Sequence, residues 1–86
     1  MNKLKNKKIL IIGGCGFIGS HVVEELLKED VKEIIIFDNF TRGKKDNIEN
    51  FLNDKRVKIY PNGGDIRDID VLNHAMKGID YVIHLA

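Results

Sequence analysis

The 86-residue sequence predicts a doubly wound α/β fold, in which helices cover both faces of a parallel sheet. Strand-like runs alternate along the chain with amphipathic helical segments, and three of the four runs lack polar alternation. Strands that are apolar on both sides are typical of parallel sheets, because helices bury both faces. With right-handed crossovers, the expected strand order is 3-2-1-4.

The predicted strands are short runs rich in isoleucine and valine, which favour extended structure. They cover residues 9–12, 33–37, 57–60 and 80–85. Pro61 marks a loop directly after the third run.

The first predicted helix starts at Phe17. When residues are placed at 100° steps, one half of the helical wheel is apolar and the other half carries Ser20, His21 and the charged side chains. We expect the apolar half to be buried. It contains Ile18, Val22, Val23, Leu26 and Leu27.

A second helix is predicted from Asp68, which is placed to cap its start, to Gly78, which is placed to end it. Its apolar face contains Ile69, Val71, Leu72, Ala75 and Met76. A shorter helix is expected over residues 46–53, burying Ile48, Phe51 and Leu52.

The composition is that of an ordinary globular domain, with 43% hydrophobic and 31% charged residues. The formal net charge of +1 predicts no general attraction to nucleic acid or to a membrane. The lysines before residue 9 are interpreted as a solvated tail, and the apolar run behind them is too short for a signal peptide or a membrane span. The single cysteine, Cys15, favours a reducing, cytoplasmic location, and no Cys/His cluster has metal-ligand spacing.

A glycine loop, GGCGFIG at residues 13–19, joins the first strand to the first helix. A carboxylate, Asp38, follows nineteen residues after Gly19 at the end of the second strand. This combination predicts a dinucleotide site. Gly13 permits a tight turn, Gly16 lets the backbone approach a pyrophosphate, and the helix N-terminus presents unpaired N–H groups. Gly19 falls on the apolar half of the wheel, where a missing side chain lets the helix lie close to the sheet.

Asp38 is expected to accept hydrogen bonds from the adenosine ribose. A carboxylate there opposes a 2′-phosphate by roughly 3 kcal/mol per charge, at about 5 Å and an effective dielectric constant of about 20. The predicted cofactor is therefore NAD. Arg42, Lys44 and Lys45 are near enough in sequence to offset part of this preference over NADP.

Longer motifs add a family resemblance. The segments GGCGFIGSHVVEELL, DNFTRGKKDNI, GDIRD and the pattern L-x-x-A-x-x-G-x-D-x-V-x-H-L-A at the end of the sequence carry it. The chain resembles the N-terminal part of the extended short-chain dehydrogenases/reductases, the NAD-dependent nucleotide-sugar epimerases and dehydratases. The resemblance implies a Rossmann-type domain truncated after its fourth strand, with the catalytic helix and the substrate domain absent. One departure is Ile12, where the family usually has threonine.

The resemblance also implies the residues of the site. Those that cradle the pyrophosphate are Gly13, Gly16, Phe17, Ile18 and Gly19. Those that hold the adenosine ribose and its flank are Asp38, Asn39, Phe40, Thr41 and Gly43. Asp65 and Ile66 meet the adenine, and Leu85 and Ala86 line the cofactor crevice.

The catalytic Tyr-x-x-x-Lys pair of this family is absent from the sequence. The fourth residue after Tyr60 is glycine and the fourth after Tyr81 is leucine, so neither tyrosine starts the motif. We predict no catalytic residue here, and expect the 86 residues alone to bind NAD weakly and to turn over no sugar nucleotide. His84 is interpreted as a core histidine, His21 and His74 as exposed, and Cys15 as a small residue filling the loop.

The sequence leaves several functions open. If the parent protein is an enzyme, the first choice is an epimerase that acts on a UDP-sugar. The sequence does not distinguish this activity from that of a dehydratase, a decarboxylase or a reductase. The nucleotide-sugar substrate is expected only in the full-length parent. A stand-alone dinucleotide-binding module and a ligand-free structural domain are the alternatives. The apolar fourth strand also suggests a homodimer formed through its exposed edge.

Overall fold

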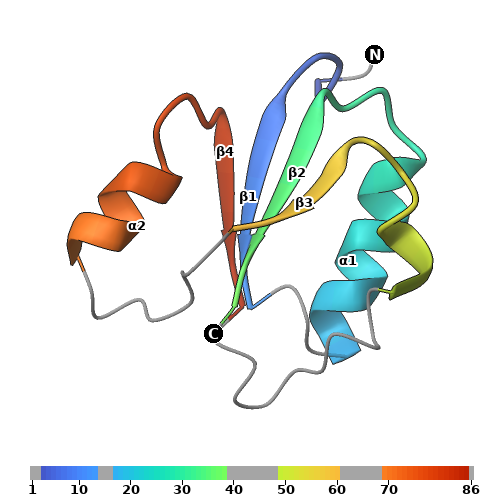
Figure 1. The fold of residues 1–86 in the computed structure, drawn as a ribbon. Helices are drawn as coiled ribbons and strands as arrows, with labels where there is room; N and C mark the ends of the chain where they lie inside the picture. Colours follow the sequence, from blue (N-terminus) through green and yellow to red (C-terminus); the bar gives the residue numbers. More distant parts are fainter. Residues whose placement is uncertain (1–2, 14–16, 39–48, 61–68, 86) are drawn as a thin grey trace.

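The computed structural model describes residues 3–13, 17–38, 49–60 and 69–85. Its strands are β1 (Lys8–Ile12), β2 (Glu33–Phe37), β3 (Val57–Ile59) and β4 (Tyr81–His84). They form one parallel sheet in the order β3-β2-β1-β4, which confirms the predicted topology. Helix α1 (Phe17–Leu27) lies on one side of the sheet and α2 (Ile69–Ala75) on the other (Figure 1).

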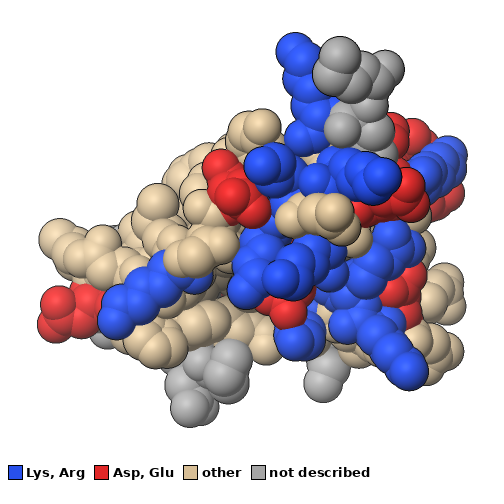
Figure 2. All heavy atoms as spheres, turned by 90° about the horizontal axis from the view of Figure 1, so that it is seen from above, with Lys and Arg blue, Asp and Glu red and all other residues tan. Residues whose placement is uncertain are grey.

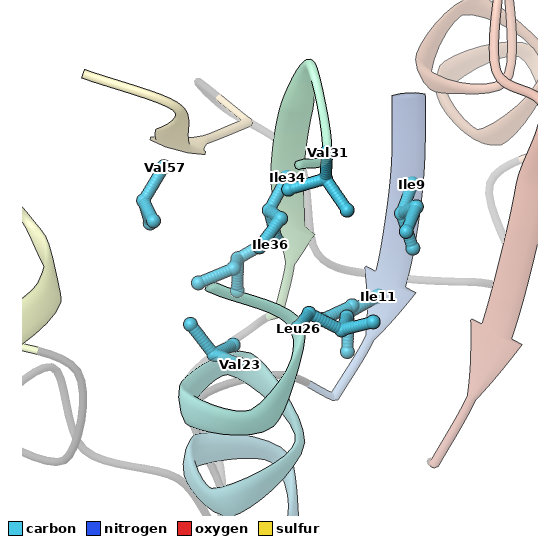
Figure 3. Close-up of a cluster of buried hydrophobic side chains, with 8 residues drawn as sticks. All are labelled: Ile9, Ile11, Val23, Leu26, Val31, Ile34, Ile36 and Val57. Atoms are coloured by element: carbon cyan, nitrogen blue, oxygen red, sulfur yellow. The ribbon is translucent and has the colours of Figure 1, made fainter. Parts of the chain in front are cut away.

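Strands β1 and β2 are buried on both faces, which explains their lack of polar alternation. Ile9 and Ile11 of β1 point into a cluster on the α1 side, whereas Leu10 and Ile12 belong to a second cluster on the α2 side. In the first cluster, Val23 and Leu26 of α1 point toward the sheet (Figure 3). Burial of these side chains against the sheet holds α1 in place.

The helical wheel correctly predicted the middle of α1 but not its start. Val23 and Leu26 are buried, whereas Ile18 is 67% exposed, so the prediction for Ile18 was wrong. The same error affects α2, where Ile69 is 68% and Met76 41% exposed. A wheel gives the direction of a side chain but not its position along the helix axis, and all three residues lie at helix ends. The residues of α2 that pack against the second cluster are Val71, Leu72 and Ala75, the last of which ends the helix.

The predicted helix over residues 46–53 is described from residue 49 onward. Residues 46–48 lie outside the described residues, and a single 3-10 turn, η2 (Glu49–Phe51), is followed by turns up to β3. Phe51 and Leu52 nevertheless pack against the α1-side cluster, as expected. After α2, Gly78 has φ +73°, a left-handed conformation that suits its predicted role in ending the helix. Asp68, the predicted cap, lies outside the described residues.

Strand β4 is the outer strand, as the predicted order implies, but one residue in it was predicted wrongly. Tyr81 and Val82 are 45% and 41% exposed, and His84 is exposed as well, so the interpretation of His84 as a core histidine was wrong. The physical reason is topological: β4 is the outer strand of the described sheet and pairs with β1 alone. His21 and His74 are exposed, as predicted.

Residues 3–6 form a turn folded against the domain, so they are not a free tail, whereas Lys3 and Lys5 are exposed to solvent, as expected. Leu4 packs against the α1-side cluster, and the Lys7 N–H donates to the Leu4 carbonyl at 3.0 Å. The Asn6 N–H donates to the Asp30 carbonyl at 2.8 Å, with Asn6 itself at φ 60°. In the part of the chain that the structure describes, neither helix is long and apolar enough to cross a membrane.

Candidate functional site

The carboxyl ends of the four parallel strands lie at one edge of the sheet, the lower edge in Figure 1. Gly13 follows β1, Asp38 follows β2 and Leu85 follows β4. In open parallel sheets, this edge is where ligands bind, at the point where strand order reverses. That point lies here at β1, since β2 and β3 are on one side of it and β4 is on the other.

Gly13 and Asp38 are neighbours because of the strand register. Ile12 pairs with Phe37, and the Gly13 N–H donates to the Phe37 carbonyl at 2.8 Å. Gly13 has φ 87°, a conformation that side chains with a Cβ atom rarely adopt. The turn that leaves β1 thus requires glycine and starts beside the half-buried Asp38.

On the other side of β1, the Leu85 N–H donates to the Ile12 carbonyl at 2.8 Å. Leu85 is 37% exposed, so its side chain is accessible beside the end of β1. The three predicted site residues that follow strands β1, β2 and β4 are therefore brought together around one strand end.

Helix α1 begins at this same edge and directs its N-terminus there (Figure 1). The first N–H groups of a helix have no partner within it and carry a partial positive charge. No acidic residue lies in the first turn of α1 to neutralise that charge. The N-terminus of α1 is therefore suited to an anion.

Gly19 is buried in the first turn of α1. It lies four residues before Val23 and seven before Leu26, on the face of α1 that packs on the sheet. Gly19 thus lies on the buried face of α1, and its role in bringing the helix close to the sheet stays a prediction. Phe17 begins α1, and Ile18 projects from the same turn into solvent.

The remaining predicted site residues lie outside the described residues. They are Gly16, Asn39, Phe40, Thr41, Gly43, Asp65, Ile66 and Ala86.

A pair that the sequence did not suggest lies on the α2 side of this edge. The Tyr60 hydroxyl and His74 Nδ1 are 2.5 Å apart, and the Tyr60 ring also packs against Phe37 with centroids 5.5 Å apart. The pair joins the residue after β3 to α2. Its only signal in the sequence is a tyrosine at a strand end, which does not identify its partner.

The described residues fit a dinucleotide by their chemistry. A pyrophosphate is an anion, and the edge offers it the N-terminus of α1 beside a turn that only glycine adopts readily. A ribose carries hydroxyl donors, and Asp38 lies at the same edge as a carboxylate acceptor.

Comparison with known proteins gives three findings. The sequence profile of the 3-beta hydroxysteroid dehydrogenase/isomerase family matches residues 10–86. UDP-glucuronic acid decarboxylase 5 from Arabidopsis thaliana is 38% identical over 81 residues, which are 94% of this chain and 22% of that protein. UDP-glucose 4-epimerase from Rickettsia bellii (strain RML369-C) is 39% identical over 85 residues, covering 94% of this chain and 24% of that protein.

Among solved structures, the Bordetella bronchiseptica enzyme WbmF in complex with NAD+ and UDP superposes with a TM-score of 0.83 at 31% identity. The match covers 100% of this chain and 24% of that one. The chain thus spans about a quarter of the length of the relatives that it matches.

Proposed function

The chain belongs to the 3-beta hydroxysteroid dehydrogenase/isomerase family, within the extended short-chain dehydrogenases/reductases that include the NAD-dependent nucleotide-sugar epimerases and dehydratases, and from this premise we propose that it binds the pyrophosphate and adenosine half of NAD. The observation that carries the proposal is the convergence of Gly13, Asp38 and the N-terminus of α1 at one edge of the sheet. Each of the three supplies a different part of the recognition.

The pyrophosphate is assigned to the N-terminus of α1. Unpaired N–H groups of the first helical turn donate to phosphate oxygens, and the helix dipole adds a favourable field. Gly13 lets the chain leave β1 without a side chain over this position. Gly19 lets α1 lie close to the sheet, which fixes the direction of its N-terminus. When bound, the cofactor supplies the nicotinamide that accepts and returns hydride; the residues named here bind and orient it.

Asp38 is assigned to the adenosine ribose. As an acceptor it pairs with the 2′- and 3′-hydroxyls, and it opposes a 2′-phosphate by roughly 3 kcal/mol per charge at about 5 Å and an effective dielectric constant of about 20. This supports NAD over NADP. The assignments of Asn39, Phe40, Thr41, Gly43, Asp65, Ile66 and Ala86 to the adenosine side and crevice stay predictions.

For the parent protein, we propose a nucleotide-sugar substrate and an epimerase acting on a UDP-sugar as the first choice. The similarity to both a UDP-glucose 4-epimerase and a UDP-glucuronic acid decarboxylase supports the substrate class and leaves the reaction open. None of the 86 residues is assigned to the chemical step. A cytoplasmic location and a homodimer through β4 also stay predictions, the second supported by the exposure of Tyr81 and Val82.

Calorimetric titration with NAD, NADP and ADP-ribose, each on wild type and Asp38→Asn, tests the proposal. We expect NAD and ADP-ribose to bind the wild type comparably and NADP to bind at least tenfold more weakly. In Asp38→Asn, the NAD affinity should fall and the preference over NADP should shrink. The matched control is Asp70→Asn, the same change at an exposed position on α2, which should leave both affinities unchanged. Equal binding of NAD and NADP by the wild type would contradict the role of Asp38.

A further inference from the structure

The edge of the sheet opposite the candidate site is rich in lysine. Figure 2 views the molecule from this side, where lysine and arginine side chains cover much of the surface. This edge consists of the amino ends of the strands and the segments that precede them. Its described lysines include Lys3, Lys5, Lys7, Lys8, Lys32 and Lys55.

Three of these lysines lie side by side, just before the starts of the neighbouring strands β1, β2 and β3. The Lys32 N–H donates to the Lys7 carbonyl at 2.9 Å, directly before the paired residues of β1 and β2. Lys55 precedes Arg56, whose carbonyl accepts the Ile34 N–H at 2.7 Å where β2 meets β3. Since neighbouring strands are about 4.8 Å apart, Lys7, Lys32 and Lys55 begin in one row across three strands.

Two further lysines are fixed beside this row. Lys3 and Lys5 are exposed on the N-terminal turn, which Leu4 anchors in the core and the Asn6 N–H joins to the Asp30 carbonyl. The lysines are thus presented by backbone that is folded against the domain.

Three acidic side chains near this edge form ion pairs with other basic residues. Glu33 pairs with Lys58 at 2.7 Å, Asp54 with Arg56 at 2.8 Å, and Glu25 with Lys28 at 3.0 Å. Three others keep their negative charge: the Asp80 carboxylate accepts the Lys8 backbone N–H at 2.8 Å, and Glu29 and Asp30 are exposed and bond to Arg56 and Asn6 through their backbone carbonyls. The six lysines of this edge still outnumber these three carboxylates. Within the described part of the chain, the side chains of Lys3, Lys5, Lys7, Lys8, Lys32 and Lys55 form no ion pair.

Adjacent like charges repel one another and oppose folding. An anionic partner bound to this row would reduce that repulsion. We propose that the lysine edge, defined by these six lysines, docks on a membrane surface that contains anionic lipids. The lysines spread over a rim at the ends of three strands, as a flat layer of headgroups requires, and each ammonium near such a surface contributes additively.

The composition of the edge disfavours nucleic acid as the occupant. Among the residues that the structure describes, the arginine at this edge is Arg56. Its guanidinium donates to Asp54 and to the carbonyls of Leu27 and Glu29. It is therefore not available for bidentate binding of a phosphate. The segments at residues 3–8, 28–33 and 53–56 contain no aromatic side chain on which bases could stack.

The sequence analysis predicted no attraction to a membrane because the net charge is only +1. Net charge, however, does not show how the charges are distributed over the surface of the fold. Docking by this edge would leave the opposite edge, with Gly13 and Asp38, facing the solvent.

Co-sedimentation with vesicles tests the proposal. The full chain is mixed with phosphatidylcholine vesicles, with or without about 30% phosphatidylglycerol, at about 25 mM and about 300 mM salt. We expect binding to the anionic vesicles only, reduced at least fivefold by the higher salt. A variant with Lys5→Gln, Lys7→Gln, Lys32→Gln and Lys55→Gln should lose at least tenfold in partition coefficient. The matched control replaces the same four lysines by arginine, which keeps the charge and should bind within about twofold of the wild type.

Three outcomes would overturn the proposal. Equal sedimentation with neutral vesicles would show that charge does not drive binding, and unchanged binding by the glutamine variant would remove the lysine edge from it. Release of the chain from anionic vesicles by a stoichiometric amount of duplex DNA would reassign the edge to nucleic acid. Circular dichroism and the midpoint of thermal unfolding show whether each variant is folded. If the glutamine variant is not folded, vesicle binding by the arginine variant is the second measurement.

Discussion

Arg56 and Asp54 form a two-point ion pair that also closes the end of α1. Nε and Nη2 of Arg56 lie 3.0 and 2.8 Å from the two carboxylate oxygens of Asp54. The same guanidinium donates to the carbonyls of Leu27 and Glu29, at 3.0 and 2.9 Å, where α1 has ended. One side chain therefore joins the start of β3 to carbonyl groups that α1 leaves unsatisfied.

Arg56→Ala should lower the free energy of unfolding by about 1–2 kcal/mol, because it removes charge-assisted hydrogen bonds at a partly exposed position. Lys55→Ala, a neighbouring exposed residue with no ion pair among the described residues, should change it by less than about 0.5 kcal/mol. Urea denaturation measures both. Equal effects of the two substitutions would show that the helix end does not depend on Arg56.

Stability should depend on pH through Asp54. The hydrogen bonds from the Arg56 side chain, and then from its backbone N–H, lower the pKa of Asp54 from 3.8 to about 2. Because the folded-state pKa is lower than the unfolded one, the stabilisation is fully present above about pH 5 and is lost as the pH falls from about 4 through 2. Both side chains are 31% exposed, so solvent screening limits this contribution to about 1 kcal/mol.

The measurement is urea denaturation of the wild type and Asp54→Asn at pH 5 and at about pH 2. The difference between the two proteins should be largest at pH 5 and shrink by about 1 kcal/mol at the lower pH. Since other carboxylates titrate in both proteins, only this difference reports on Asp54. A difference that does not change with pH would contradict the lowered pKa.

Ile36 and Ile18 provide a matched pair for the core. Ile36 is fully buried in the α1-side cluster (Figure 3), whereas Ile18 is 67% exposed. Ile36→Val removes one buried methylene and should cost about 1 kcal/mol in the free energy of unfolding. Ile18→Val should cost less than about 0.5 kcal/mol. A comparable loss from both would mean that Ile18 is buried in solution, as the helical wheel predicted.

The sequence was sufficient for elements that local pattern determines. The bounds of β2 were predicted without error, and the order of the sheet followed from apolar strands and crossover handedness. Errors arose where burial depends on the arrangement of whole elements: Ile18 and Met76 lie at helix ends, and His84 lies on the outer strand. For the site, the meeting of Gly13 and Asp38 follows from parallel register. The Tyr60–His74 contact depends on how α2 packs, which no local pattern contains.

Tyr60→Phe should have a small effect because it removes only the hydrogen bond to His74 and keeps the ring contact with Phe37. We expect a loss of about 0.5–1 kcal/mol in the free energy of unfolding. Tyr60→Ala should cost more, since it also removes the contact with Phe37 at the end of β2. If both variants unfold at the same urea concentration, the ring contributes nothing and α2 is held by Val71, Leu72 and Ala75 alone.

Gly13→Ala and Gly78→Ala separate backbone strain from cofactor binding. Both glycines have positive φ, at 87° and 73°, so alanine should destabilise the fold by about 1 kcal/mol or somewhat more at each. At Gly78 a Cβ atom would meet nothing within 4 Å, so strain is the main effect there. Gly13 lies beside Asp38 at the candidate site, where a Cβ atom also changes the turn that leads to α1.

We therefore expect Gly13→Ala to lose at least tenfold in NAD affinity, whereas Gly78→Ala binds NAD like the wild type. Urea denaturation compares the stabilities, and calorimetric titration compares the affinities of the folded variants. Because the two substitutions impose similar strain, a difference in affinity isolates the position of Gly13 from loss of stability. Equal affinities in the two variants would indicate that the turn after β1 serves the fold alone, and the pyrophosphate would then have to be assigned elsewhere.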